Sequence, residues 1–88
     1  MNVAFRDSFA RDLRRVTDQR LLNRVRAAIE AAEHADNLEE ISNLKPLRGG
    51  GGYYRVRVGD YRLGLMLRGD ELTFVRFLHR KEIYRFFP

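Results

Sequence analysis

The stretch GGGGYYRVRVGDYRL, residues 49–63, decides how this chain folds. After the glycines, aliphatic residues alternate with polar or aromatic ones, and Gly59-Asp60 then supplies the two residues of a tight turn. Alternation with a period of two is typical of a strand that has one buried face, and glycine in a two-residue loop is typical of a hairpin. We therefore predict antiparallel strands at Tyr53–Val58 and Tyr61–Leu67.

A two-residue turn fixes which residues lie opposite each other across the hairpin, and opposite residues share a face. Arg57 is then paired with Arg62, and Arg55 with Gly64. The apolar face, which we expect the helices to cover, contains Tyr54, Val56, Val58, Tyr61, Leu63, Leu65 and Leu67. The basic face contains Tyr53, Arg55, Arg57, Arg62, Gly64, Met66 and Arg68.

The basic face favours a site for phosphate. Like charges directly opposite each other destabilise a sheet by about 0.2–1 kcal/mol, so stability alone does not select Arg57 opposite Arg62. Gly64 is expected to leave a gap through which a ligand backbone approaches, with Met66 in the same groove. The alternative is a solvated face kept soluble by charge, although mixed lysine and glutamate serve that purpose better.

Two amphipathic helices are predicted ahead of the hairpin, after a short opening strand at Asn2–Phe5. Asp7 is the expected cap of the first helix, and Thr17-Asp18 starts the second, which ends at His34–Asn37. We expect the two helices to form an antiparallel hairpin. Their apolar stripes contain Phe9, Leu13 and Val16 in the first helix and Leu22, Val25, Ile29 and Ala32 in the second.

The remaining segments complete an α+β fold. Residues 38–48 are predicted to be an irregular connection, and the turn Gly69-Asp70 predicts a third strand at Glu71–Leu78. The predicted architecture has two layers, an N-terminal strand and two-helix hairpin packed on an antiparallel sheet with a three-strand C-terminal meander. At 88 residues, we expect residues 1–88 to form one domain.

Charge is concentrated in the C-terminal half. The net charge is +5, and residues 45–88 hold ten Lys/Arg against four Asp/Glu, whereas residues 1–44 hold seven against eight. Arginine provides 15 of the 17 basic residues, and its planar guanidinium suits bidentate contacts with phosphate. A basic half points to an acidic partner, either nucleic acid or protein.

The composition excludes several classes of protein. There is no cysteine, so a disulfide framework and thiolate chemistry are ruled out. The charged start MNVAFRDSFARDL does not fit a signal peptide, and no segment approaches the ~20 apolar residues of a membrane span. We expect a soluble cytoplasmic protein without membrane association.

Two segments of the basic half resemble a known family. LKPLRGGGGYYRVRVGDYRLG, residues 44–64, and FLHRKEIYRFF, residues 77–87, are similar to the RelE/ParE superfamily of toxins of type II toxin-antitoxin systems. The similarity covers essentially the whole chain, in the order strand, helix, helix, meander and basic C-terminal segment.

Two activities share this fold, so the fold does not decide the function. RelE-like members cut mRNA in the ribosomal A site, whereas ParE-like members inhibit DNA gyrase and do not cleave RNA. The ending H-R-K-E-I-Y resembles the RelE-like branch, which implies ribosome-dependent, metal-independent endonucleolytic cleavage of mRNA. A ParE-like gyrase inhibitor and a degenerate, non-catalytic RNA-binding member are the alternatives.

The resemblance implies a set of site residues on the strands and the C-terminal segment. Arg55 and Arg57 match a basic pair on the first meander strand, and Arg62, Arg80 and Tyr84 match a strand arginine, a late arginine and a late tyrosine. The predicted catalytic residues are Arg57, Arg62, His79, Arg80 and Tyr84. The predicted RNA-binding residues are Arg55, Arg57, Arg62, Arg68 and Tyr84.

These residues suit RNA cleavage without a metal ion. Attack of a ribose 2′-oxygen on phosphorus builds negative charge that fixed guanidinium groups stabilise. The family lysine of the first meander strand is replaced by arginine, which is a poor general base. His79 is the expected substitute, with a structural role as its alternative, and Tyr84 is expected to stack on a base or else to cap the core with Phe86 and Phe87.

The resemblance also implies the partners. We expect no metal and no cofactor, the ribosome and its mRNA as the target, and an acidic RelB-like antitoxin that covers the arginines. A toxin-antitoxin heterotetramer is one form of that complex.

Overall fold

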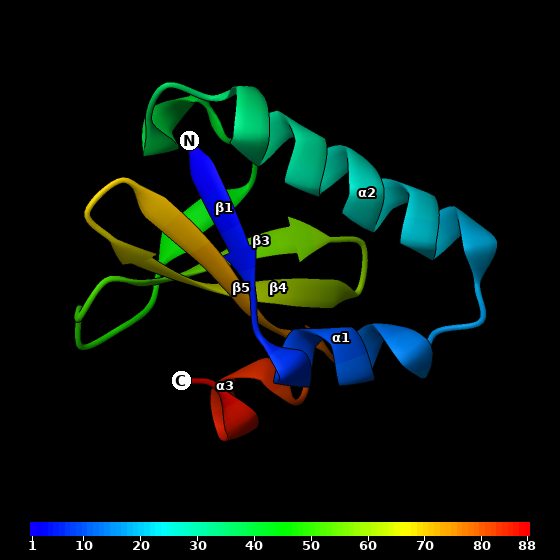
Figure 1. The fold of residues 1–88 in the computed structure, drawn as a ribbon. Coiled ribbons are helices and arrows are strands. Elements are labelled where there is room, and N and C mark those ends of the chain that lie inside the picture. Colours follow the sequence, from blue (N-terminus) through cyan, green and yellow to red (C-terminus); the bar gives the residue numbers. More distant parts are fainter.

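A five-stranded mixed sheet with the order β1-β5-β4-β3-β2 forms the centre of the fold, and two helices lie on one of its faces (Figure 1). The computed structural model describes residues 1–88. The elements are β1 (Asn2–Phe5), α1 (Asp7–Arg14), α2 (Gln19–His34), the 3₁₀ turn η1 (Leu38–Glu40), β2 (Leu44–Pro46), β3 (Tyr53–Val58), β4 (Tyr61–Arg68), β5 (Glu71–His79) and α3 (Ile83–Phe86). The predicted α+β class is confirmed.

The predicted hairpin register is confirmed. Arg57 pairs with Arg62 and Arg55 with Gly64 across β3 and β4. The four glycines that precede β3 have φ angles of 89°, 69°, 76° and 77°, a left-handed conformation that glycine adopts without steric cost. The glycine run therefore reverses the chain between β2 and β3.

The sheet is mixed rather than wholly antiparallel, because β1 pairs with β5 in parallel. The N-terminal ammonium of Met1 donates hydrogen bonds to the carbonyl oxygens of Ala32, Glu33 and Ala35, at 3.2, 3.0 and 2.6 Å. These carbonyls belong to the C-terminal end of α2, where backbone acceptors lack partners within the helix. The start of β1 is thereby tied to α2.

The connection over residues 38–48 was predicted to be irregular, and this was wrong. It contains η1 and the edge strand β2, in which Leu44 pairs with Val56, Lys45 with Arg55 and Pro46 with Tyr54. The strand was missed because it has three residues and contains proline, which lacks the N–H that a strand donates but is tolerated at a sheet edge.

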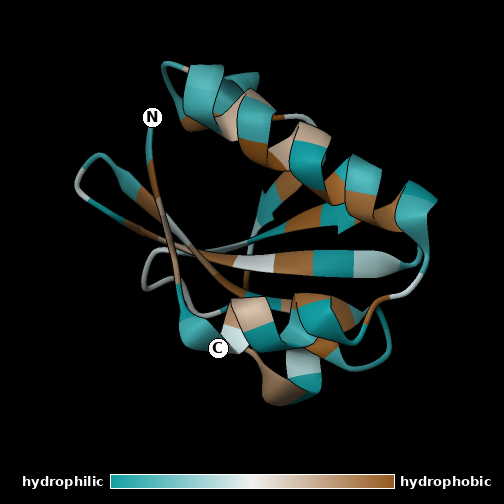
Figure 2. Ribbon diagram, turned by 45° about the vertical axis from the view of Figure 1, so that its right-hand side comes forward, coloured by the Kyte–Doolittle hydropathy of each residue, from teal (hydrophilic) through white to brown (hydrophobic).

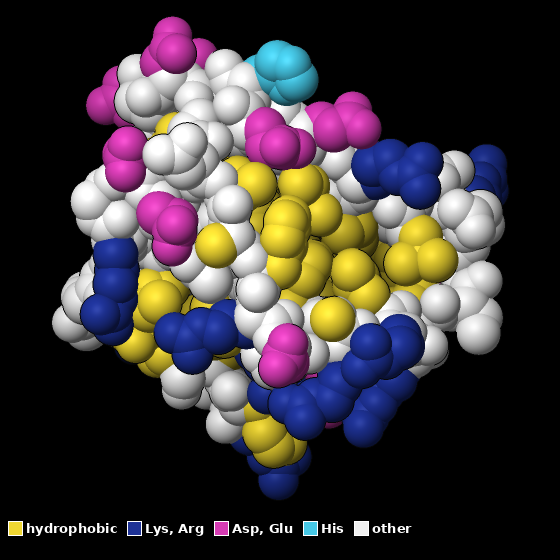
Figure 3. Space-filling view, viewed as in Figure 1, with side chains coloured by type: hydrophobic (Ala, Val, Ile, Leu, Met, Phe, Trp, Pro, Cys, Tyr) yellow, Lys and Arg dark blue, Asp and Glu magenta, His cyan; other side chains and the backbone are white.

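The two long helices do not form the predicted hairpin. They run over different strands and are splayed apart (Figures 1 and 2), and hydrophobic side chains are exposed between them (Figure 3). Hydrogen bonds fix α1 to β5 instead, from Ser8 Oγ to the Val75 carbonyl at 2.6 Å and from the Phe77 N–H to Asp12 Oδ2 at 2.9 Å. Asp12 also forms an ion pair with Arg76, at 2.8 Å.

Local capping chemistry determines the start of α2 but not that of α1. Asp18 caps α2 as predicted, because its carboxylate accepts hydrogen bonds from the N–H groups of Arg20 and Leu21. Asp7 was expected to cap α1 but is its first helical residue, and the preceding Arg6 makes no side-chain capping bond. An acidic side chain in the first turn still interacts favourably with the helix dipole.

The main core lies between the sheet and the helices, on the face predicted from the hairpin register. Val56, Val58, Leu63 and Leu65 of β3 and β4 are buried there. The other core residues are Phe9, Val25, Ala32, Ala35, Ile41, Leu72, Phe74 and Phe77. The alternating pattern of the sequence therefore identified the buried side of the sheet.

A second, smaller core lies on the basic face, where it was not expected. Leu47, Ile83 and Phe87 pack together there, and Met66, which was assigned to an open groove, is only 6% exposed. The expected gap at Gly64 is filled, because a Cβ atom at this position would lie 2.8 Å from the Phe87 ring. The C-terminal segment therefore covers the part of the basic face where Gly64 has no side chain.

Ile83→Ala tests this second core, in which Ile83 is fully buried. We expect the free energy of unfolding to fall by about 2–5 kcal/mol, because the substitution opens a cavity beneath the C-terminal segment. The control is Phe86→Ala, in which the replaced ring is 51% exposed, and its expected cost is below about 1 kcal/mol. Urea melts of the two variants decide the point. Equal and small losses would mean that the C-terminal segment is not packed on the sheet.

Candidate functional site

The candidate site is centred on Arg62 at the turn end of β4. Arg62 is half-buried, and its Nη1 donates hydrogen bonds to the carbonyl oxygens of Gly59 and Tyr61, each at 2.9 Å. The guanidinium is thus fixed by the backbone of its own hairpin turn. Arg57 lies directly opposite on β3, so two cations share this end of the sheet.

Other arginines converge on the same point. Burial lowers the pKa of Arg62, and the positive charges of Arg55, Arg57 and Arg80 lower it further, whereas Tyr84 acts in the opposite direction. Nearby cations have this effect because they disfavour another positive charge. We call Arg55, Arg57, Arg62 and Arg80 the arginine cluster. The ion pair of Asp12 is made with Arg76, which is not one of these arginines.

Arg80 reaches the cluster through the main chain. Its N–H donates a hydrogen bond of 2.7 Å to the carbonyl oxygen of Asp60, in the turn that joins β3 and β4. The residue that follows β5 is therefore held beside the turn that carries Arg57 and Arg62. This backbone contact fixes the point at which the Arg80 side chain leaves the main chain.

Tyr84 is presented by the short C-terminal helix. Ile83 and Phe87, its neighbours on α3 and just beyond, are 0% and 3% exposed and anchor the segment, whereas Tyr84 is 66% exposed. The Phe87 ring lies edge-on to Tyr53 with 5.6 Å between ring centroids. The core-capping alternative for Tyr84 is therefore wrong, since Phe87 performs that role, and the Tyr84 ring is free to contact a ligand.

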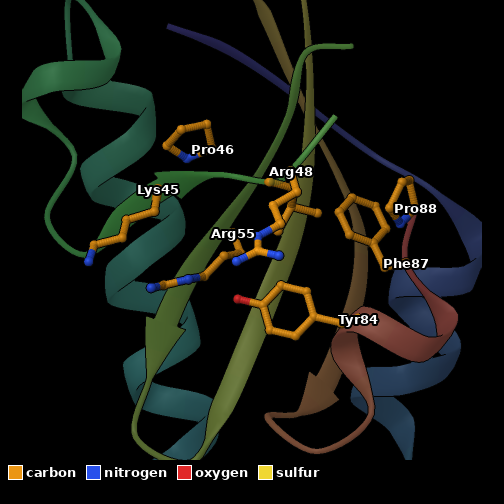
Figure 4. A pocket seen from close by; sticks show the side chains of 8 residues that line it. Lys45, Pro46, Arg48, Arg55, Tyr84, Phe87 and Pro88 are labelled. Carbon is orange, nitrogen blue, oxygen red and sulfur yellow. The ribbon is translucent and has the colours of Figure 1, made fainter. Parts of the chain in front are cut away.

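A cleft of about 670 Å³ lies between β2 and the C-terminal segment. The Tyr84 hydroxyl points into it, toward Arg48 and Arg55 (Figure 4). Its lining residues are Lys45, Pro46, Leu47, Arg48, Arg55, Tyr84, Phe87 and Pro88. Lys45 and Arg48 were missed in the sequence. The signal that could have found Lys45 is its place between two aliphatic positions, Leu44 and Leu47, just ahead of the hairpin.

His79 does not join the cluster. It pairs across β4–β5 with Tyr61, whose side chain lies on the helix-covered face, and the two rings are 5.4 Å apart in a T-shaped arrangement. Its Nδ1 accepts a hydrogen bond of 3.2 Å from the Lys81 N–H. Because opposite residues share a face, the structure places His79 on the far side of the sheet from Arg57 and Arg62.

Arg68 is also remote from the cluster. It lies at the opposite end of β4 and pairs with Glu71 beside the next turn. Six residues of strand separate it from Arg62, which corresponds to about 20 Å. The structure therefore brings together Arg55, Arg57, Arg62, Arg80 and Tyr84 and leaves Arg68 and His79 outside.

The arrangement suits an anion with several oxygen atoms. Guanidinium groups approach from two strands and from the end of a third, and an aromatic ring lies at one side. No three His, Cys, Asp or Glu side chains are grouped so that they could hold a metal ion. None of the helices is long and apolar enough to cross a membrane.

Comparison with known proteins identifies the family. The model of the ParE toxin of the type II toxin-antitoxin system parDE matches residues 3–84. Toxin RelE3 of Methanocaldococcus jannaschii is 38% identical over 89 residues, covering 100% of both chains. The chain therefore belongs to the RelE/ParE family and is a toxin of a type II toxin-antitoxin system, homologous to RelE.

Solved structures agree with this assignment. A chain in the crystal structure of the RelB-RelE antitoxin-toxin complex from Methanococcus jannaschii is 36% identical and superposes with a TM-score of 0.82, covering 97% of this chain and 99% of that chain. A chain in the archaeal RelE-RelB complex from Pyrococcus horikoshii OT3 is 19% identical with a TM-score of 0.74, covering 93% and 97%. At that lower identity the likeness shows the fold alone.

Proposed function

We propose that this toxin inhibits translation by cutting mRNA on the ribosome, without a metal ion. The observation that carries the proposal is the geometry of the arginine cluster: Arg57 lies directly opposite Arg62 across β3 and β4, and the Arg80 N–H is bonded to the turn that joins these strands. A cluster of like charges is unfavourable by itself. A phosphate group that binds among them removes this cost.

The proposed reaction is an internal transesterification. The ribose 2′-hydroxyl passes its proton to solvent water, its oxygen bonds to the adjacent phosphorus, and the bond from phosphorus to the 5′-oxygen of the next nucleotide breaks. That oxygen takes up a proton as it leaves, so the products are a 2′,3′-cyclic phosphate and a free 5′-hydroxyl. Negative charge builds on the phosphoryl oxygens in the transition state, and Arg57, Arg62 and Arg80 are the groups that stabilise it. Arg62, whose guanidinium the carbonyl oxygens of its own turn hold in place, needs little reorganisation to do so.

Proton transfer is assigned to a different kind of group. Arginine remains protonated and cannot serve as a general base, and His79 lies on the far face of the sheet. Among the predicted residues this leaves the Tyr84 hydroxyl, whose O–H can donate a proton to the leaving 5′-oxygen; it points toward Arg48 and Arg55 (Figure 4). The Tyr84 ring also suits stacking on an unpaired base, as aromatic rings do in single-stranded RNA recognition.

The proposed partners follow from the family. The chain of the M. jannaschii complex similar to this protein was crystallised with RelB, and we propose an acidic RelB-like antitoxin for this toxin, in a heterotetramer of toxins and antitoxins. A net charge of +5 favours both an acidic protein and RNA. The ribosome as target places the proposed activity in the cytoplasm.

Inhibition of DNA gyrase is the alternative function. It is favoured by one observation, namely that the matching family model describes a ParE toxin. Such a toxin binds a protein target and performs no chemistry on RNA. The two activities leave different products, so one experiment separates them.

Induced expression followed by primer extension on cellular mRNA, beside a gyrase supercoiling assay, tests the proposal. We expect new mRNA 5′ ends in register with codons, because cleavage takes place on ribosomes that are reading a message. Supercoiling by gyrase should be unaffected. Broken DNA together with intact mRNA would instead assign the protein to the gyrase-inhibiting class.

Substitutions in the site separate charge from proton transfer. Arg80→Ala should slow single-turnover cleavage on programmed ribosomes by about 10²-fold or more, because it removes a charge that stabilises the transition state. Tyr84→Phe should fall together with Tyr84→Ala if the hydroxyl moves a proton, whereas stacking alone predicts loss only in Tyr84→Ala. His79→Gln should keep the rate and its pH profile. Full activity in Arg80→Ala and both Tyr84 variants would remove the catalytic assignment.

A further inference from the structure

The strand β5 contains one residue more than the part of β4 with which it pairs. Leu65 of β4 pairs with Phe74 of β5. The residue before Leu65, which is Gly64, pairs with Arg76 instead of Val75. Val75 therefore has no partner in β4 and forms a β-bulge, a feature that bends a strand and changes where the following side chains point. Bulges of this kind often lie next to active sites.

The bulge determines which face of the sheet each residue at the end of β5 occupies. Phe74 and Phe77 are three residues apart, yet both are buried in the main core. In a regular strand every second residue after Phe74 would share its face, and Arg80 would then point toward the helices. Because the bulge shifts this alternation by one residue, Arg80 follows β5 on the side of the arginine cluster, where its charge acts on Arg62.

Helix α1 holds the bulge from the side of β5 that faces away from β4. The pairing of β1 with β5 ends at Phe74, so beyond this residue β5 has no strand on that side. Ser8 Oγ donates a hydrogen bond of 2.6 Å to the Val75 carbonyl oxygen. The Phe77 N–H donates one of 2.9 Å to Asp12 Oδ2. Ser8 and Asp12 lie about one helical turn apart on the same face of α1, and we call these two side chains the α1 clamp.

Asp12 also holds the side chain of the residue that follows the bulge. Its carboxylate accepts hydrogen bonds from Arg76 Nε at 2.8 Å and from Arg76 Nη2 at 3.3 Å. Asp12 is buried, and a carboxylate that is removed from water needs partners of this kind. Each residue from Val75 to Phe77 is therefore bonded to α1, directly ahead of the segment that leads to Arg80.

The place of Arg80 depends on the register that the bulge sets. Tyr61 pairs with His79, so Arg80 lies beside Asp60, whose carbonyl oxygen accepts a hydrogen bond of 2.7 Å from the Arg80 N–H. Without the bulge, Leu78 would lie opposite Tyr61. Arg80 would then lie one residue away from its acceptor.

We infer that Ser8 and Asp12 are positioning residues for the proposed RNA cleavage, because they fix the bulge that places Arg80 beside the hairpin turn. The inference rests on the proposed function, in which Arg80 stabilises the transition state. Neither residue of the α1 clamp belongs to the arginine cluster, so the clamp acts on the reaction through β5. A group that is misplaced by about 1 Å can slow a reaction by about 10²-fold, so loosening of the clamp has a measurable effect.

Cleavage on programmed ribosomes tests the inference with conservative variants of the clamp. Ser8→Ala and Asp12→Asn should each lower kcat by about tenfold or more with KM retained, because a misplaced Arg80 weakens transition-state stabilisation and not the binding of RNA. Ser8→Thr keeps the hydroxyl and should restore kcat to within about twofold of wild type. The control is Asp7→Asn, which changes an exposed carboxylate on the same helix and should match wild type. Wild-type kcat in both Ser8→Ala and Asp12→Asn would overturn the inference.

A double-mutant cycle with Arg80→Ala separates positioning from general support of the fold. If Asp12 acts through Arg80, Asp12→Asn should slow the wild-type reaction about tenfold but slow the Arg80→Ala variant by less than about twofold. General destabilisation would slow both backgrounds by the same factor, and that result would overturn the inference. The same cycle with Ser8→Ala carries the test if Asp12→Asn does not fold.

Amide hydrogen exchange in the isolated toxin tests the clamp without the ribosome. In Ser8→Ala and Asp12→Asn, exchange at the Arg80 amide should accelerate by about fivefold or more, because the end of β5 opens locally. Exchange at the Leu67 amide, which is bonded to the Gly52 carbonyl oxygen, should keep its wild-type rate. Equal acceleration at both amides, or none at Arg80, would overturn the inference.

The two kinds of measurement separate this inference from the proposed function. If wild type cleaves mRNA and the cycle with Arg80→Ala shows independent effects, the inference fails alone. If wild type cleaves no mRNA, the proposed function fails, and the exchange rates still decide whether α1 holds the end of β5 in place.

Discussion

The pairing of Arg57 with Arg62 across the β3–β4 hairpin is the constraint on which the rest of the site depends. The two-residue turn fixes this register, and the same register turns the aliphatic residues of both strands toward the helices. Arg62 is held by carbonyl oxygens of its own turn, so it cannot simply swing away from its neighbour. The fold therefore keeps two cations together that repel each other, and in the proposed function an anion bound between them compensates for this repulsion.

The C-terminal segment completes the site and also stabilises the sheet beneath it. Phe87 packs where Gly64 leaves no side chain, and Ile83 is fully buried, so α3 has one anchored side and one exposed side. Tyr84 lies on the exposed side and, like Lys45 of β2, lines the cleft. Packing and the proposed function thus use different sides of one short helix, and a substitution of the buried Ile83 would act on the site through the position of Tyr84.

Much of the fold and of the candidate site could be predicted from the sequence, wherever the pattern of neighbouring residues alone determines the structure. Gly59-Asp60 determined the register, and alternation then identified the buried face and the arginines that share the other one. The errors arose where tertiary packing decides. The edge strand of Lys45 is too short to show a period, Phe87 fills the gap at Gly64 from a distant part of the chain, and the face of His79 depends on its pairing with β4. A list of basic and aromatic residues therefore found all four arginines of the cluster and Tyr84, but it also included Arg68 and His79, which lie outside the cluster.

A double-mutant cycle between Arg57 and Arg62 tests the central claim most directly. Free energies of unfolding are measured at low salt for wild type, Arg57→Gln, Arg62→Gln and the double variant, with and without a non-cleavable RNA tetranucleotide. The cycle cancels the free energy of the hydrogen bonds that Arg62 makes independently of Arg57, and leaves the interaction between the two arginines. Without RNA, we expect the coupling between Arg57 and Arg62 to destabilise the fold by about 0.2–1 kcal/mol. With RNA bound, we expect this coupling to vanish or to change sign. A coupling of zero without RNA, or one that RNA leaves unchanged, would contradict the claim that the pair is held together to bind phosphate.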